Sequence, residues 1–200
     1  MLAEIPFIEH GFGTRHDGVW PESTTCTTAR QVHSAVVLEA NEPGVAGEGD
    51  ALITNRPGLF VSIRTADCVP ILLVDRKNRA VAAVHAGWRG TVAGILSRTL
   101  EKMAQVYQTS PSDVRLAFGP AILSCCFEVG EEVAAQFGLN GQSHVDLVAE
   151  NQRQAAAAGV SPASMNSLGL CTSCNVTEFY SFRKERDAAG RMYSAIRIRP

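Results

Sequence analysis

The feature that most constrains the fold is a run of short apolar segments in the middle of the chain. Residues 51–53, 59–63, 71–74 and 80–84 are mostly apolar and of strand length, which is typical of β-strands. Residues 75–79, which separate the last two segments, are all polar. A polar turn between two apolar strands predicts a β-hairpin, so the centre of the chain predicts a sheet.

Helical patterns begin after this centre. Val92, Ile95, Leu96, Leu100 and Met103 recur at three- and four-residue steps, which predicts one helix with a single apolar stripe. Further helices are expected at residues 131–137 and 147–158, and further strands at 36–38, 114–118, 179–182 and 194–198. Loops are expected at residues 19–28, 42–44 and 47–49.

Strands and helices do not alternate strictly along the chain, so we expect an α+β fold with a mixed β-sheet flanked by helices. The 200 residues suit a single layered catalytic domain, residues 1–200, with one substantial core. Hydrophobic residues make up 46% and charged residues 19%, which is typical of a globular domain. With a net charge of −2 and scattered Lys and Arg, no nucleic-acid or anionic-membrane partner is expected.

Residues 1–6 do not form a basic segment followed by a long apolar run, so they do not predict a secretory signal. No stretch of the sequence approaches the length of a membrane span. We therefore expect a cytoplasmic protein that does not associate with membranes. The oligomeric state does not follow from the sequence, and a monomer is favoured.

The six cysteines are expected to be reduced, because the chain is long and carries no export signal. Cys171 and Cys174 have the two-residue spacing of a zinc or redox pair, but no second such pair and no nearby His completes four ligands. Cys125 and Cys126 are adjacent, and neighbouring cysteines rarely bind one metal together. The sequence therefore predicts no metal site at these four residues.

Three other segments contain the residue types of a catalytic metal site. Two imidazoles and one thiol, from His33, Cys68 and His85, suit a borderline-soft divalent ion such as zinc. Three protein ligands leave a fourth position for water or substrate, and a water there loses its proton near neutral pH. The sequence therefore predicts a metalloenzyme with one Zn²⁺ per chain.

Each of the three ligands lies at the end of a predicted strand. Pro70 favours an extended Val69, which places Cys68 at a junction between a strand and a turn. His85 closes the strand at 80–84, and His33 lies where a loop leads into a strand. These positions are consistent with one edge of a shared sheet.

Structural interpretations compete with the functional ones. A single His beside apolar residues is more often a hydrogen-bonded core residue, and a Cys after an apolar run is more often a small buried hydrophobe. Arg89 and Thr91 open the predicted helix, where they either hold an anion such as phosphate, or form a surface ion pair and a cap. Trp88 either stacks on a planar base or packs beside the turn. Asp67 either orients a ligand imidazole or caps a turn.

With these motifs in order, the chain resembles the bacterial laccase-domain family. That family was formerly described as multicopper polyphenol oxidases and is now described as purine nucleoside phosphorylases with adenosine deaminase activity. The segment at residues 85–90 (His-Ala-Gly-Trp-Arg-Gly) is highly distinctive. The other matching segments are residues 10–15, 31–33, 49–54, 65–70, 119–121, 128–130, 171–172, 180–183 and 190–191.

The resemblance implies a catalytic zinc held by His33, Cys68 and His85. It also implies a layered fold of helices and strands that acts on adenosine, inosine or methylthioadenosine, with phosphate as cosubstrate. We expect the catalytic residues to be Cys68, His85 and Asp67, and the substrate to contact the residues Gln31, Trp88, Arg89 and Arg15. The chain departs from the family in a short segment between Arg15 and Gln31, and in Asp17, where the family usually has Gly.

Two other functions remain open at this point. Oxidation of phenols by four coppers would require roughly ten His ligands, and the chain has five His, so copper is disfavoured. Alternatively, Cys68 acts as a thiolate nucleophile activated by an imidazole, in an amide or ester hydrolase. Some members of the resembled family edit peptidoglycan precursors by removing a misincorporated L-serine, which fits this chemistry.

Overall fold

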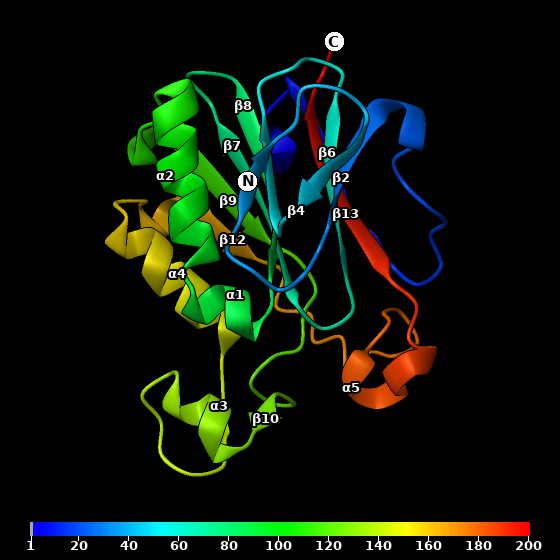
Figure 1. Ribbon diagram of the computed structural model, residues 1–200, viewed down its shortest axis with the longest axis vertical. Helices are drawn as coiled ribbons and strands as arrows, with labels where there is room; N and C mark the ends of the chain where they lie inside the picture. Colours follow the sequence, from blue (N-terminus) through cyan, green and yellow to red (C-terminus); the bar gives the residue numbers. More distant parts are fainter. Residues whose placement is uncertain (1) are drawn as a thin grey trace.

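Two β-sheets packed face to face form the centre of the molecule, and helices cover the outer face of one of them (Figure 1). A computed structural model describes residues 2–200. The five-stranded sheet has the order β1 (Ile8–Phe12), β13 (Met192–Ile198), β6 (Phe60–Thr65), β2 (Cys26–Arg30), β4 (Gly44–Glu48). The six-stranded sheet has the order β12 (Met165–Ser167), β9 (Val114–Phe118), β7 (Val69–Asp75), β8 (Ala80–Ala86), β5 (Ala51–Thr54), β3 (Val37–Glu39). A separate two-stranded ribbon consists of β10 (Glu128–Val129) and β11 (Ser143–His144).

Strands β7 and β8 lie side by side in the six-stranded sheet and are buried along their whole length. They pair antiparallel, which confirms the predicted hairpin. Their side chains alternate between two cores, because Ile71 and Leu73 face the helices while Leu72 and Val74 pack toward the five-stranded sheet. Both faces of the hairpin are therefore covered, which explains why its strands are apolar apart from Asp75 and His85.

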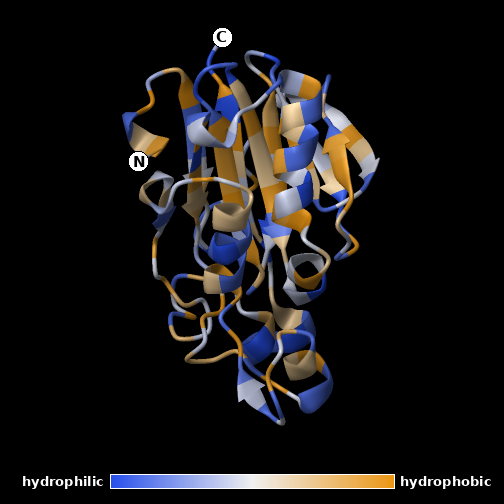
Figure 2. Cartoon of the chain, turned by 90° about the vertical axis from the view of Figure 1, so that its left-hand side faces the viewer, coloured by the Kyte–Doolittle hydropathy of each residue, from blue (hydrophilic) through white to orange (hydrophobic). Residues whose placement is uncertain are grey.

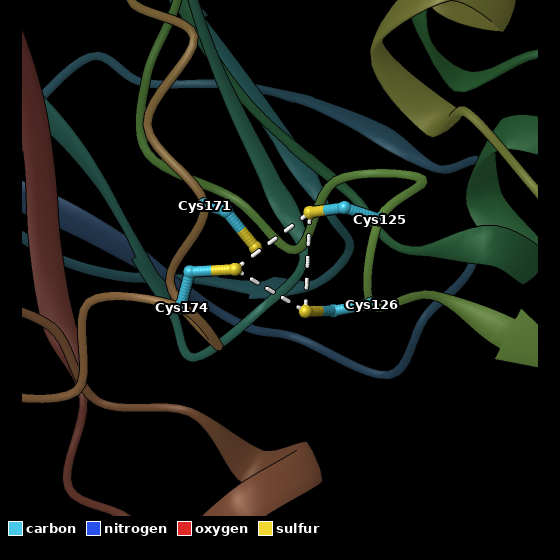
Figure 3. Close-up of side chains that lie close together, drawn as sticks. All are labelled: Cys125, Cys126, Cys171 and Cys174. Carbon is cyan, nitrogen blue, oxygen red and sulfur yellow. Dashed lines mark hydrogen bonds between the residues drawn. The ribbon is translucent and has the colours of Figure 1, made fainter.

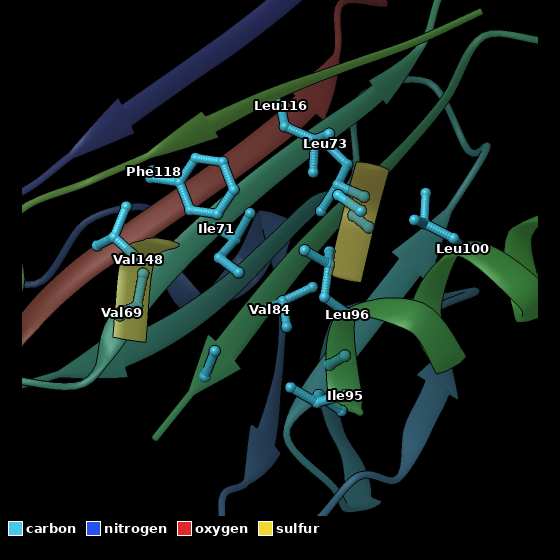
Figure 4. Close-up of a cluster of buried hydrophobic side chains, with 14 of the residues drawn as sticks. Val69, Ile71, Leu73, Val84, Ile95, Leu96, Leu100, Leu116, Phe118 and Val148 are labelled. Carbon is cyan, nitrogen blue, oxygen red and sulfur yellow. The ribbon is translucent and has the colours of Figure 1, made fainter. Parts of the chain in front are cut away.

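Helices α2 (Ile95–Tyr107) and α4 (Leu147–Ala157) cover the outer face of the six-stranded sheet. Ile95, Leu96 and Leu100 of α2 are buried against this sheet, as Figure 4 shows. The helices are amphipathic, and the strands between them and the second sheet are apolar (Figure 2). Burying one apolar stripe against a sheet is what stabilises a helix of this length.

The predicted helix through residues 92–103 is two helices. Helix α1 (Trp88–Val92) ends before Gly94, whose left-handed backbone (φ 75°) separates it from α2. Val92 is 40% exposed and does not belong to the apolar stripe. Helices α3 (Glu131–Ala135) and α4 confirm the predictions at 131–137 and 147–158 within a few residues. Short 3-10 turns occur at Leu2–Glu4, Ser23–Thr25, Pro111–Asp113, Pro162–Ser164 and Arg186–Ala188.

Two sets of predicted segments are wrong. Residues 179–182 do not form a strand, because helix α5 (Phe182–Glu185) begins there and the Glu185 carboxylate accepts the backbone N–H of Ser181 (2.9 Å). The predicted loops at 19–28, 42–44 and 47–49 overlap β2 and β4, which pair in parallel despite their glycines and polar side chains. Hydrogen bonds between the two strands pair their backbone N–H and C=O groups. The local sequence does not predict such pairing between separate segments.

The α+β class is confirmed, with two mixed sheets where the sequence predicted one. Both sheets contain parallel and antiparallel pairs. Across residues 2–200, the helices are too short or too polar to cross a membrane.

Candidate metal centre and its cavity

His33, Cys68 and His85 meet although they are far apart in the sequence, and one ligand atom from each lies within 4.8 Å of the others. Nε2 of His33 is 3.9 Å from Sγ of Cys68, and the two imidazole centroids are 4.8 Å apart. The β7–β8 hairpin explains part of this arrangement. His85 is paired with Pro70, so Cys68, two residues before Pro70, lies beside it at the same end of the hairpin.

Asp50 organises the other part of the centre. Its buried carboxylate accepts Nδ1–H of His85 (2.8 Å) and the backbone N–H groups of His33 (3.0 Å) and Ser34 (2.6 Å). The Ser34 hydroxyl donates to the same carboxylate (2.7 Å). A carboxylate can only accept, so Nδ1 of His85 carries the proton and Nε2 is left for a metal. One buried aspartate thus fixes one ligand ring and folds the loop that bears another.

The sequence prediction did not include Asp50, and it proposed that Asp67 either orients a ligand imidazole or caps a turn. Both Asp67 oxygens accept hydrogen bonds elsewhere, from the Thr172 hydroxyl (2.6 Å) and the Arg183 backbone N–H (2.6 Å). Asp67 therefore ties the Cys68 segment to the C-terminal part of the chain, and it is Asp50 that binds the His85 ring. The available signal for Asp50 was an acidic residue directly before an apolar strand.

Gly87 is required by the close approach of two ligands. A Cβ atom at this position would lie 3.0 Å from Sγ of Cys68 and 3.0 Å from Cδ2 of His33. His33 itself has a left-handed backbone (φ 59°), which is uncommon for a residue with a side chain. The hydrogen bonds to Asp50 hold this conformation, so the loop is shaped for the position of the His33 ring.

The electrostatics of Cys68, His85 and Asp50 favour their charged forms. Burial would raise the pKa of the Cys68 thiol, but the nearby His85 and His33 outweigh it and lower the pKa to about 6. Burial would lower the pKa of His85, but the Cys68 thiolate and the Asp50 carboxylate raise it to about 9. Burial would likewise raise the pKa of Asp50, and its hydrogen bonds with His85 and Ser34 lower it to about 2. These pKa shifts favour a thiolate at Cys68 and an imidazolium at His85 in the metal-free centre.

The centre opens into a cavity of ≈ 840 Å³, which is within the usual range for small-molecule sites of roughly 300–1,000 Å³. Its walls combine aromatic and cationic side chains. Trp88, Phe127 and Phe182 supply the large aromatic rings. The cationic side chains are five arginines: Arg64, Arg89, Arg183, Arg186 and Arg191. Within residues 2–200 no carboxylate forms an ion pair with any of these arginines, so the cavity is suited to an anionic ligand.

Among the residues expected to contact substrate, Trp88 and Arg89 line the cavity, and the Arg89 guanidinium lies 4.3 Å from the Trp88 ring centroid. Gln31 also lines it, but its amide exchanges two 2.8 Å hydrogen bonds with the backbone of Arg64. Gln31 is thus placed to position Arg64.

Arg15 is not among the residues that line the cavity. Its guanidinium binds the carbonyl of Val176 and the carboxylate of Glu185 (3.0 Å) and stacks on Tyr180. These contacts tie the N-terminal loop to α5 and to the segment before it. The position of Arg15 therefore supports a structural role and gives no support to the predicted substrate contact.

The remaining cysteines, apart from the buried Cys26, form a second cluster. One ligand atom each from Cys125, Cys126, Cys171 and Cys174 lies within 4.8 Å of all the others. The sequence predicted no metal site here because neither pair had further ligands nearby in the chain, but the structure brings the two pairs together. The two pairs are distant in the chain, and local spacing does not reveal a contact between distant segments.

Comparison with known proteins places the chain in a family. Residues 14–199 match the family described as multi-copper polyphenol oxidoreductase laccase. The chain belongs to this family. The matched range contains His33, Cys68 and His85, so the laccase-family match includes the whole candidate centre.

Several proteins similar to this chain are named as enzymes. A purine nucleoside phosphorylase of Bacteroides thetaiotaomicron is 42% identical over 74% of this chain and 60% of that protein. One of Deinococcus radiodurans is 40% identical over 83% of this chain and 67% of that protein. Adenosine deaminase RL5, from an unknown prokaryotic organism, is 39% identical over 84% of this chain and 72% of that protein. The match thus spans less than two thirds of the Bacteroides protein.

Solved structures of the same fold agree with the layered architecture. YlmD from Geobacillus stearothermophilus superposes with a TM-score of 0.90 at 27% identity, covering 98% of this chain and 93% of that chain. The Bacillus licheniformis protein YfiH superposes with a TM-score of 0.91 at 24% identity, covering 96% of this chain and 93% of that chain.

Proposed function

We propose that this chain is a zinc-dependent purine nucleoside phosphorylase with adenosine deaminase activity, acting on adenosine, inosine and methylthioadenosine. The observation that carries the proposal is the position of a three-ligand centre in a cavity lined by aromatic rings and arginines without carboxylate partners. The names of the relatives support the same activities.

The donor set supports zinc. Two imidazoles and a thiolate are suitable ligands for this borderline-soft ion, and Asp50 holds His85 with Nε2 available, as the partners of zinc-binding imidazoles do. Bound there, Zn²⁺ would supply Lewis acidity to a water or a substrate group. Gly87 leaves the space that the approach of His33 and Cys68 requires.

The arginines support phosphate as the second substrate. The guanidinium groups of Arg64, Arg89 and Arg186 have no hydrogen-bond acceptor within residues 2–200. Arg183, by contrast, donates to the carbonyls of Cys126 (3.1 Å) and Glu128 (3.0 Å). The three unengaged arginines would bind the phosphate that attacks the ribose carbon and displaces the purine.

The aromatic residues of the cavity would bind the purine. Trp88, Phe127 and Phe182 line the same cavity as the centre. Stacking on aromatic faces tolerates adenine and hypoxanthine alike, which fits a broad choice of nucleosides.

The experiment combines both reactions in one assay. Purified protein is incubated with adenosine, with and without inorganic phosphate, and products are separated by chromatography. Adenine and ribose 1-phosphate should form only with phosphate, and inosine and ammonia in either case. His85→Ala should abolish both reactions, while His16→Ala, at an exposed imidazole bound to Glu178, should change neither. Equal product formation by His85→Ala would contradict the proposal.

A hydrolase is the second candidate, because the metal-free centre favours a thiolate. The pKa of Cys68 lies at about 6 and that of His85 at about 9, which suits a nucleophile that attacks an amide of a muropeptide. Full activity in the presence of chelator, lost on alkylation with iodoacetamide, would favour this candidate over zinc catalysis.

A further inference from the structure

Four cysteine side chains from two distant segments point toward one another (Figure 3). Cys125 and Cys126 lie in the connection from β9 to β10, and Cys171 and Cys174 lie between β12 and α5. Sγ of Cys174 is 3.7 Å from that of Cys125 and 3.4 Å from that of Cys126, and the last two are 3.9 Å apart. We call these four residues the cysteine cluster.

Backbone pairing brings the two segments together. Ala121 and Cys171 form an isolated parallel bridge, in which Ala121 N–H donates to the Leu170 carbonyl (3.1 Å) and Thr172 N–H to the Ala121 carbonyl (3.0 Å). The backbone bridge between Ala121 and Cys171 thus holds one side of the cysteine cluster in place. Its position follows from the fold and not from bonds between the sulfurs.

The spacing of the sulfur atoms fits a tetrahedral ion. Four sulfurs at about 2.3 Å from a zinc ion lie about 3.8 Å from each other. The three distances among Cys125, Cys126 and Cys174 are close to this value, and Sγ of Cys171 lies within 4.8 Å of the other three. A disulfide would bring two sulfurs to about 2.05 Å, and all six cysteines of the chain are free thiols. The distances therefore match ligands around one ion better than a cross-link.

The surroundings are suited to a metal with thiolate ligands. Leu123 N–H approaches Sγ of Cys171 at 3.5 Å, a contact that stabilises sulfur carrying negative charge. The Arg183 guanidinium, bound to the Cys126 carbonyl, adds a cation nearby. Cys171 is buried while Cys125 and Cys174 are exposed, so an ion can enter from the solvent side.

We propose that Cys125, Cys126, Cys171 and Cys174 bind a second Zn²⁺ ion with four thiolate ligands. Four protein ligands fill the tetrahedral shell, so this site is structural and has no open position for substrate. The thiol protons pass to solvent as the ion binds. The proposal is independent of the proposed function, since it concerns other residues.

The second ion would stabilise one wall of the cavity. Phe127 follows the first pair of cysteines directly, and Arg183 connects this segment to α5 through the carbonyls of Cys126 and Glu128. Joining the two segments through one ion would hold Phe127 and Arg183 in place together. The catalytic centre and the cysteine cluster would thus share a wall of the cavity.

The test measures zinc per chain by elemental analysis of protein purified without chelator. The double variant Cys125→Ser/Cys174→Ser should contain one zinc fewer than the wild-type protein, whatever the content of the catalytic centre. Cys26→Ser, at a buried cysteine outside both centres, is the matched control and should keep the wild-type content. His33→Ala should lose only the ion of the catalytic centre. An unchanged zinc content in the double variant would overturn the proposal.

A second measurement uses the wild-type protein and does not depend on a variant that folds. Cys125 and Cys174 are exposed, so iodoacetamide should alkylate them slowly in protein as purified and about tenfold faster after a chelator has removed the ion. Peptide mapping separates their alkylation from that of Cys68. Equal rates before and after chelation, or a disulfide between Cys125 and Cys174 in the peptide map, would overturn the proposal.

Discussion

The two cysteine-containing centres are built in different ways. His33, Cys68 and His85 are held by a buried hairpin and by Asp50, which is itself wholly buried. The cysteine cluster lies on two connections, and two of its four thiols are exposed. In the first centre the surrounding protein holds the three side chains in place. In the second, a bound ion would hold the two connecting segments in place.

This difference indicates what each centre can do. A preorganised centre with three ligands keeps a coordination position open and tolerates loss of its ion without loss of shape. A cluster on loops gains its order from the ion, so ion binding contributes directly to folding there.

Asp50→Asn should have the largest effect. It removes the buried charge that pairs with His85 while keeping the size of the side chain, and breaking a buried ion pair costs about 3–5 kcal/mol. Zinc affinity at the catalytic centre should fall about 10–100-fold. Urea unfolding and competition with a chelator measure the two losses.

Asp75→Asn is the matched control for Asp50→Asn. Asp75 is equally buried and accepts the backbone N–H groups of Lys77 and Asn78 in the β7–β8 turn. Its variant should be less stable but keep the wild-type zinc affinity. If both variants lost zinc affinity equally, the organising role of Asp50 would be refuted.

A change of one pH unit should have the next largest effect on zinc binding. Between pH 6 and 9 the metal-free centre carries a proton on His85 and none on Cys68, and that proton must leave before Nε2 can bind the ion. Affinity should therefore rise about tenfold per pH unit through this window and level off above about pH 9. Titrations in the Cys125→Ser/Cys174→Ser background isolate the catalytic centre. An affinity that is flat from pH 6 to 9 would rule out this proton linkage.

Gly87→Ala should displace two ligands at once. The added Cβ would lie 3.0 Å from both Sγ of Cys68 and Cδ2 of His33. Such overpacking costs about 1–3 kcal/mol, and we expect this cost to appear as a loss of free energy of zinc binding. Gly130→Ala is a close control, because Gly130 also precedes a five-residue helix with a similar extended backbone and has no atom within 4 Å of an added Cβ. Chelator competition should show weaker binding only for Gly87→Ala.

The grouping of His33, Cys68 and His85 could be predicted because their residue types are specific and because Cys68 and His85 lie at the ends of apolar strands. Asp50 could not, since its role depends on a loop that folds back over it from residues 32–34. The cysteine cluster was missed for a related reason. Its two halves meet through the bridge between Ala121 and Cys171, a contact between distant segments that local spacing does not encode.

The fold shows the same limit. Largely apolar strands such as β7 and β8 are recognisable in the sequence, because both of their faces are buried. Strands β2 and β4 contain Thr, Arg and Gly and are recognised only through their pairing in parallel with each other. The segment at 179–182 is aromatic like a strand, yet the contact of Glu185 with Ser181 begins a helix there.

Thr172→Val should have the smallest effect, and it tests whether the two centres are linked. The Thr172 hydroxyl donates to Asp67 (2.6 Å), which joins the segment of the cysteine cluster to the residue next to Cys68. Removing this bond should cost about 1–3 kcal/mol of stability. In a cycle with Asp67→Asn, the coupling between the two substitutions should be about 0.5–3 kcal/mol. Thr99→Val, which removes a buried hydroxyl bonded within α2, should show no coupling to Asp67→Asn. If the losses in the free energy of unfolding for Thr172→Val and Asp67→Asn are additive, the hydrogen bond between these residues does not couple the two centres.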